Sequence, residues 1–293
     1  FFFKQKTAYE IPKRDWSSDV CSSDLGLLFK IGAVPFHAWT PDVYQGAPTP
    51  ITGFMAAATK VAALGATLRL FYVAFAGAAW NWRPIITAVA VLTMVAGSLL
   101  AIAQRDVKRM LAYSSIAHAG FLLTGVLALN VEGLRATLFY LAIYGVATLG
   151  GFAIVTLVRD ASGEVTDLNR WVGLAKRSPF VAAAFALFLL SFAGIPLTSG
   201  FIGKFTIFSA AYESGNTGVV VIGVLSSAIA AFFYIRVIVM MFFADPDDDS
   251  VAVTIPSIFT SMTIWFAAVV TVVMGIFPTP LLNAINSLAT FLR

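Results

Sequence analysis

From residue 26 onwards, the sequence is a succession of apolar runs that are each long enough to cross a membrane. A bilayer core is about 30 Å thick and takes about 20 apolar residues per helix. The chain is 59% hydrophobic and only 12% charged, whereas a soluble domain carries about 25% charged residues. With so little charge, lipid must cover part of the apolar surface. The sequence therefore predicts an all-α integral membrane protein, folded as a multi-pass helix bundle.

Eight membrane spans are expected after residue 25. They cover residues 26–40, 50–76, 85–103, 111–130, 134–158, 179–212, 216–243 and 255–280. The linkers alternate between basic and nearly uncharged, and basic linkers stay in the cytoplasm under the positive-inside rule. By this rule, four linkers lie on the cytoplasmic side: 41–50, 104–110, 159–178 and 244–254. The third of these is expected to contain a short surface helix around Leu168–Leu174.

The first 25 residues do not share the membrane pattern. They are polar, aperiodic and rich in serine, and they lack the apolar core of a signal peptide. They resemble a translated sequencing-adapter read. We therefore expect residues 1–25 to be foreign and residues 26–293 to be a transmembrane domain truncated at its N-terminus, the alternative being a genuine disordered N-terminal segment.

Two of the spans are expected to be interrupted. Pro35 lies inside the first span and removes a backbone donor there. The sixth span, 179–212, would be about 50 Å long as one regular helix, and the segment AGIPLTSG around Pro196 breaks it. Lys30 precedes the first break and Lys204 follows the second. Paired broken helices are typical of inverted-repeat transporters with a site near the midplane, so we expect part of an inverted-repeat, antiporter-like fold.

A third lysine lies in the middle of an uninterrupted span. Lys60 is ten residues past Pro50, which places it about 15 Å into the second helix and near the bilayer centre. Ionisable groups at that depth are costly and mark functional sites by default. Ser114, Ser115 and His118 share one face of another span. After residue 25 no acidic residue lies mid-span, so any carboxylate partner must come from elsewhere.

Several function classes are excluded or unsupported. The sequence contains no HExxH pattern, no P-loop and no GxGxxG, and Cys21 is the single cysteine. No basic patch interleaved with aromatic residues indicates nucleic-acid binding. We therefore expect no metal, cofactor or redox centre in this chain, and lipid as its surroundings.

Three long motifs resemble a known family. They are GLLFKIGAVPFHAWTPDVYQGAPTP from residue 26, AQRDVKRMLAYSSIAHAGF from residue 103 and LSFAGIPLTSGFIGKF from residue 190. In order and spacing they resemble the antiporter-like membrane subunits of respiratory NADH–quinone oxidoreductase (complex I), of the subunit N type. The resemblance covers essentially all of residues 26–293.

The resemblance implies a fourteen-helix subunit of which this chain holds about the last eight helices. It implies proton transfer through Lys30, Lys60 and Lys204, with Pro35 and Pro196 at the helix breaks. The family's glutamate that partners the Lys30-type residue would lie in the missing part. NADH, flavin, iron–sulfur and quinone sites are implied in other subunits of the complex, which would be this chain's partners. The implied location is the inner (plasma) membrane of a bacterium, in preference to an organelle.

The mechanism expected from these residues is stepwise proton transfer along the midplane. Removing an ammonium group from water favours the neutral amine, so a buried lysine can take up and release protons near neutral pH. His118, the serines and water would link the lysines, and redox chemistry elsewhere would supply the energy.

Simpler roles remain open beside this mechanism. Each lysine can be a structural cation that satisfies free carbonyls, and His118 a buried, hydrogen-bonded histidine. His37 is interpreted as structural, and Lys108 and Arg109 as topology signals. A subunit of a multi-subunit cation/proton antiporter, or a membrane scaffold without a transport role, are the alternative functions.

Overall fold

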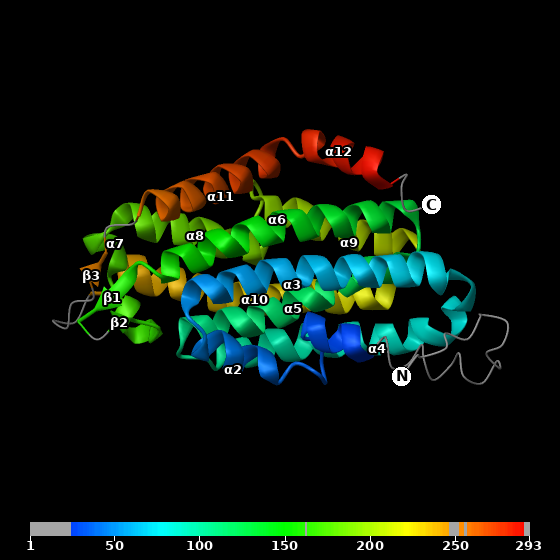
Figure 1. The fold of residues 1–293 in the computed structure, drawn as a ribbon, viewed down its shortest axis with the longest axis horizontal. Coiled ribbons are helices and arrows are strands. Elements are labelled where there is room, and N and C mark those ends of the chain that lie inside the picture. Colours follow the sequence, from blue (N-terminus) through cyan, green and yellow to red (C-terminus); the bar gives the residue numbers. More distant parts are fainter. Residues whose placement is uncertain (1–24, 162, 246–251, 255–256, 290–293) are drawn as a thin grey trace, which may run out of the picture.

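The fold of the chain is a bundle of long helices with a small β-sheet at one end (Figure 1). A computed structural model describes residues 25–161, 163–245, 252–254 and 257–289, so the segment expected to be foreign lies almost wholly outside the described residues. A helical segment over residues 25–31 precedes the labelled helices. Those are α2 (Trp39–Gly46), α3 (Thr49–Arg69), α4 (Ala79–Ile102), α5 (Val107–Ala128), α6 (Val131–Val155), α7 (Leu174–Arg177), α8 (Pro179–Ala193), α9 (Ser199–Glu213), α10 (Thr217–Phe243), α11 (Ile258–Ile276) and α12 (Thr279–Ala289).

Within the described residues, six helices are long and apolar enough to cross a membrane. They are α3 continued through a π-helical turn to Ala74, α4 with its preceding 3-10 turn, α5, α6, α10 and α11. The other two expected spans, 26–40 and 179–212, are in pieces: the helical segment 25–31 is followed by a break at residues 32–38, and the second span comprises the apolar helix α8 and then α9. The eight expected spans are therefore accounted for as six continuous helices and two broken ones, which confirms the predicted fold class.

Helix α5 forms the centre of the bundle and α11 lies at its periphery. Of the apolar window of α5, 94% is buried inside the protein, whereas the figure for α11 is 17%. Close contact with α4 contributes to this burial: a Cβ on Gly97 would lie 2.5 Å from the Ala117 nitrogen, and one on Gly120 would lie 2.7 Å from the Met94 nitrogen. Small residues of this kind let membrane helices approach closely.

The first break covers residues 32–38 and contains a cis peptide bond between Val34 and Pro35. The expectation that the first helical span ends at residue 40 is wrong, because α2 begins at Trp39 and continues to Gly46. Pro41 is tolerated there since the first turn of a helix has no internal acceptor for its N–H groups.

The second break separates α8 from α9 at residues 194–198. Gly194 ends α8 in the left-handed conformation, with φ of +82°, which glycine adopts without strain. Its N–H and that of Ile195 both donate to the Leu190 carbonyl, at 3.0 Å. The predicted interruption of the sixth span around Pro196 is thus confirmed.

The described residues of the four linkers expected to be cytoplasmic lie together at one end of the bundle. Strands β1 (Val158–Asp160), β2 (Gly163–Glu164) and β3 (Ala252–Val253) form an antiparallel sheet in the order β2-β1-β3. This sheet was not predicted, and it joins the linker after α6 to the linker after α10 (Figure 1).

Further contacts connect the linkers at this end. Arg109 forms an ion pair with Asp42 at 2.8 Å, and Lys176 donates a hydrogen bond to Asp245, which lowers the pKa of that carboxyl. The expected surface helix near 168–174 appears as a 3-10 turn, Leu168–Trp171, followed by α7. At the C-terminal side, the last predicted span is shorter than expected, and α12 follows it as a separate helix.

Candidate functional site

Lys60 is buried in the middle of α3, with 2% of its surface exposed. Its Nζ donates to the Ser115 carbonyl of α5 at 2.6 Å and to the Ile31 carbonyl at 3.3 Å. Ile31 is the last residue of the helical segment before the first break, where a carbonyl has no intrahelical donor. Lys60 therefore joins three helical segments and satisfies a carbonyl that the break exposes.

Lys204 is buried beside the second break, with 5% of its surface exposed. Its Nζ donates to the carbonyls of Phe192 and Ala193, at 2.7 and 3.0 Å, and to the Ser227 hydroxyl of α10 at 2.8 Å. Both carbonyls belong to the final turn of α8. The ammonium also lies 4.9 Å from the centre of the Phe121 ring, a distance at which a cation is attracted to an aromatic face.

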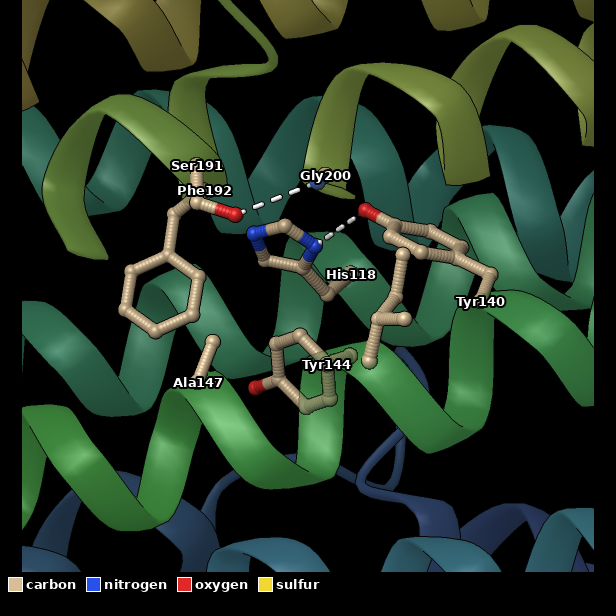
Figure 2. A pocket seen from close by; sticks show the side chains of 8 residues that line it. His118, Tyr140, Tyr144, Ala147, Ser191, Phe192 and Gly200 are labelled. Carbon is tan, nitrogen blue, oxygen red and sulfur yellow. Dashed lines mark hydrogen bonds between the residues drawn. The ribbon is translucent and has the colours of Figure 1, made fainter. Parts of the chain in front are cut away.

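His118 lies on α5 between Ser115, which Lys60 binds, and Phe121, which Lys204 faces. It is surrounded by a cluster of aromatic rings (Figure 2). Its Nδ1 is 2.5 Å from the Tyr140 hydroxyl, and its Nε2 is 3.3 Å from the Tyr234 hydroxyl. The ring stacks at a tilt on Tyr144, with centroids 4.7 Å apart. Figure 2 shows the imidazole flanked by Tyr140 and Phe192. The histidine interacts electrostatically with Lys204 and Lys60, so the charge on each lysine affects the proton affinity of the imidazole.

Further hydroxyl groups lie near His118 on the same helix, α5. Ser114 and Tyr234 share a hydrogen bond between their hydroxyls, and the Ser115 hydroxyl is 3.5 Å from that of Tyr44. The expectation that Ser114, Ser115 and His118 share one helical face holds in part. Ser114 and His118 both contact the Tyr234 hydroxyl, whereas Ser115 binds Lys60 through its backbone carbonyl and Tyr44 through its hydroxyl. Among the described residues, no hydrogen bond joins His118 directly to either lysine.

Lys30 is not brought to this cluster. The structure leaves it exposed on the helical segment before the first break, so the expectation that Lys30 is buried beside the break does not hold within the described residues. Lys60 reaches across from α3 and occupies that position instead. Pro35 and Pro196 both lie exposed within their breaks, as the expected helix interruptions require.

The surroundings of Lys108 and His37, interpreted above as a topology signal and a structural residue, are now defined. Lys108 is buried, with 3% exposure, and donates to the Ala47 carbonyl at the end of α2 at 2.6 Å. His37 has its Nδ1 buried without a hydrogen-bond partner in the described part of the chain. Lys108 therefore anchors α5 to α2 in addition to carrying a topology charge.

The tyrosines of the cluster were missed in the sequence. Tyr140 and Tyr144 are spaced one helical turn apart in an apolar span, and Tyr234 lies mid-span, so their hydroxyls needed buried partners. The need of these hydroxyls for buried partners was the sequence signal that could have indicated the cluster. Across the described ranges, no group of three or more histidine, cysteine or acidic residues is placed to hold a metal ion.

The comparisons with known proteins agree with this architecture. The family described as "NADH:quinone oxidoreductase/Mrp antiporter, TM" matches residues 24–230. A relative from Rhodococcus opacus (strain B4), named NADH-quinone oxidoreductase subunit N, is 62% identical over 269 residues, which are 92% of this chain and 50% of the relative. A relative from Streptomyces griseus, named NADH-quinone oxidoreductase subunit N 3, is 62% identical over 92% of this chain and 48% of its own length. The chain thus spans about half the length of the curated relatives it matches.

Solved structures give the same result for the fold. A chain of respiratory complex I from Thermus thermophilus with bound aureothin superposes with a TM-score of 0.78 at 34% identity, over 89% of this chain and 57% of that one. A chain of the Mrp complex from Dietzia sp. DQ12-45-1b superposes with a TM-score of 0.82 at 22% identity, over 92% of this chain and 58% of that one. At this lower identity the second likeness bears on the fold alone.

Proposed function

The chain belongs to the NADH:quinone oxidoreductase/Mrp antiporter family of membrane proteins, and on that premise we propose that it is a proton-translocating membrane subunit of an NADH–quinone oxidoreductase. Relatives at 62% identity carry the name of subunit N of that complex. In this proposal the chain lies in a bacterial plasma membrane beside other membrane subunits. NADH oxidation and quinone reduction take place in those partners, and this chain moves protons.

One observation carries the proposal: two buried lysines each bind the free carbonyls of a helix break, and a hydrogen-bonded cluster lies between them. Lys60 binds Ile31 and Lys204 binds Phe192 and Ala193. Buried ionisable groups inside a membrane are rare and mark ion pathways.

The proton route that we infer runs from Lys60 to Lys204 through the cluster around His118. Tyr234 and Tyr140 bond the two nitrogens of the imidazole, and Ser114 continues the chain of hydroxyls. Hydroxyl and imidazole groups can both donate and accept, so they pass protons without leaving their places. Water molecules complete the steps on either side of this cluster.

Charge coupling links the protonation states of the three groups. Because His118 interacts with both lysines, a change in the charge of one lysine alters the proton affinity of the histidine and, through it, of the other lysine. Inside a low-dielectric interior such interactions are strong. We assign Lys30 to the same function as a third proton-transfer group, whose carboxylate partner lies outside the described residues.

A cation/proton antiporter subunit is the alternative with the same fold. The likeness to the Mrp complex is at 22% identity and supports the fold alone, whereas relatives named subunit N reach 62%. The sequence similarity therefore favours the oxidoreductase.

The test is Lys60→Met in the intact complex, in inverted membrane vesicles, following NADH oxidation and proton uptake together. Loss of a proton-transfer group slows the transfer about a hundredfold or more, so we expect assembled complex without proton uptake. Lys176→Met is the matched control, because Lys176 is an exposed surface lysine. Wild-type proton uptake in an assembled Lys60→Met complex would refute the proposal.

A further inference from the structure

Lys204 has three hydrogen-bond partners, of which two are carbonyls and one is a hydroxyl. The carbonyls belong to Phe192 and Ala193, and the hydroxyl belongs to Ser227. A lysine ammonium has three N–H donors, so the charged form is fully satisfied at this position. All three contacts are between 2.7 and 3.0 Å, which is the normal range for such bonds.

The neutral amine has different needs. Loss of the proton leaves two N–H donors and one lone pair on Nζ, and the lone pair requires a donor. A carbonyl accepts and never donates, whereas a hydroxyl does both. Of the three partners, Ser227 alone can reverse its role. It also lies 3.4 Å from the Ala193 carbonyl, which accepts its hydroxyl proton while Lys204 is charged.

From this geometry we propose that Ser227 is a positioning residue that satisfies Lys204 in both its charged and its neutral form. When Lys204 carries the proton, the Ser227 oxygen accepts from Nζ and the hydroxyl proton points to Ala193. When Lys204 has released the proton, the Ser227 hydroxyl rotates and donates to Nζ. One rotation about a side-chain bond thus replaces a rearrangement of the helix break.

Lys60 has no partner of this kind in the described structure. Its two acceptors, Ile31 and Ser115, are both backbone carbonyls. Two acceptors match the two N–H donors of a neutral amine, and neither can donate to the lone pair. The hydroxyl partner therefore distinguishes the Lys204 site from the Lys60 site.

Other titratable groups face Lys204 from the helices around it. Helix α5 contributes His118, which interacts electrostatically with Lys204. Helix α6 contributes Tyr140, which packs against the neighbouring Gly203, and α10 contributes Tyr234, which bonds His118. The sequences of α8 and α11 contain no titratable side chain. A change at Ser227 alters none of these groups directly.

The inference rests on the proposed function, because it assigns a role to a neighbour of a proton-transferring lysine. The experiment is Ser227→Ala in the intact complex, with the ratio of proton uptake to NADH oxidised measured from pH 6 to pH 9. Hydrogen bonds to charged groups are stronger than those to neutral groups, so the variant destabilises charged Lys204 more than neutral Lys204. We expect the alkaline limb of the pumping profile to move to lower pH by about one unit.

Three further variants keep the result interpretable. Ser227→Thr retains the hydroxyl and should restore the wild-type profile. Ser227→Cys has nearly the same volume and a weaker donor, so it should shift the profile part of the way even if the alanine variant assembles poorly. Ser226→Ala is the matched control: it is the same change one residue away on α10, and Ser226 is not a partner of Lys204.

The outcomes separate this inference from the function on which it rests. A profile that does not move in Ser227→Ala, or that moves equally in Ser226→Ala, overturns the role of Ser227. Lys204→Ala is measured in parallel. If it stops pumping while Ser227→Ala behaves as wild type, the inference alone fails. If Lys204→Ala pumps normally, the proposed function of that lysine fails as well.

Discussion

At the first helix break the buried side-chain hydrogen-bond partners come from neighbouring helices, whereas at the second they come mainly from the two halves of the broken helix. The Ile31 carbonyl is bound by Lys60 of α3, and the Val34 N–H donates to the Thr93 hydroxyl of α4 at 3.0 Å. Within the broken helix, backbone bonds from the Gly32 and Ala33 N–H groups close the end of the first segment. The side-chain bond between the two halves, from the Trp39 indole to the Phe29 carbonyl, is exposed.

The second break is closed by its own residues. Lys204 of α9 binds the last carbonyls of α8, and the Gly200 N–H donates to the Ser191 hydroxyl at 3.1 Å. The backbones also touch: a Cβ on Gly200 would lie 1.9 Å from the Ser191 carbonyl oxygen. Ser227 is the donor or acceptor that a neighbouring helix adds.

This difference separates two ways of keeping irregular backbone inside a membrane. Free backbone groups at that depth must be satisfied within the protein. Because its free backbone groups bond to side chains of α3 and α4, the first break depends on the packing of these two helices. Hydrogen bonds from within make the second break a compact unit that is held by its own contacts, with Lys204 bonded to it.

The largest loss of stability is expected for Gly200→Ala, which places a methyl group inside the second break. The added methyl would collide with backbone of α8, which cannot move without opening the break, and we expect a loss of more than about 4 kcal/mol. The measurement is the amount of assembled subunit and the thermal unfolding midpoint of the purified complex. Gly65→Ala on α3 is the control, because a Cβ there meets nothing within 4 Å. A stable Gly200→Ala complex would show that the two halves are not in backbone contact.

A smaller effect is expected for Ser191→Ala. The change leaves the buried Gly200 N–H at the start of α9 without an acceptor, at a cost of about 2 kcal/mol. We expect a lower unfolding midpoint with proton uptake per NADH retained, because Lys204 keeps its own partners. Ser191→Thr, which keeps the hydroxyl, is the control. An unchanged midpoint in the alanine variant would mean that the break does not depend on this bond.

The smallest effect is expected for Thr93→Val, the corresponding change at the first break. The isosteric valine fills the space on α4 but removes the acceptor for the half-buried Val34 N–H, at a cost of about 1 kcal/mol. Unfolding midpoints of this variant and of Ser191→Ala, measured side by side, test the ranking. A larger loss at Thr93 would mean that the first break is the more tightly held of the two.

The architecture was largely predictable from the sequence because its signals are local. Apolar length defined the spans, and Pro35 and Pro196 defined the breaks. The mid-span position of Lys60 predicted its burial, and the break beside Lys204 did the same for that lysine. These inferences need only the residue spacing along one helix.

Contacts between helices were not predictable in the same way. That Lys60, and not Lys30, binds the first break depends on how α3 packs against a segment 29 residues earlier. The partnership of His118 with Tyr140 and Tyr234 joins three helices. The β-sheet pairs linkers that are far apart in the sequence, and each of its strands is too short to show an alternating pattern.

The distances along the chain between donors and acceptors have a consequence for biosynthesis. At the second break Lys204 follows Ala193 by 11 residues, so the donor and the acceptor are synthesised almost at the same time. At the first break Lys60 follows Ile31 by 29 residues and Thr93 follows Val34 by 59. The first break must therefore wait, during insertion, for two later helices to be translated. During that interval an insertion chaperone or the translocation channel would shield the free backbone groups of the first break from lipid. The lysine of the second break needs no such partner to reach its carbonyls.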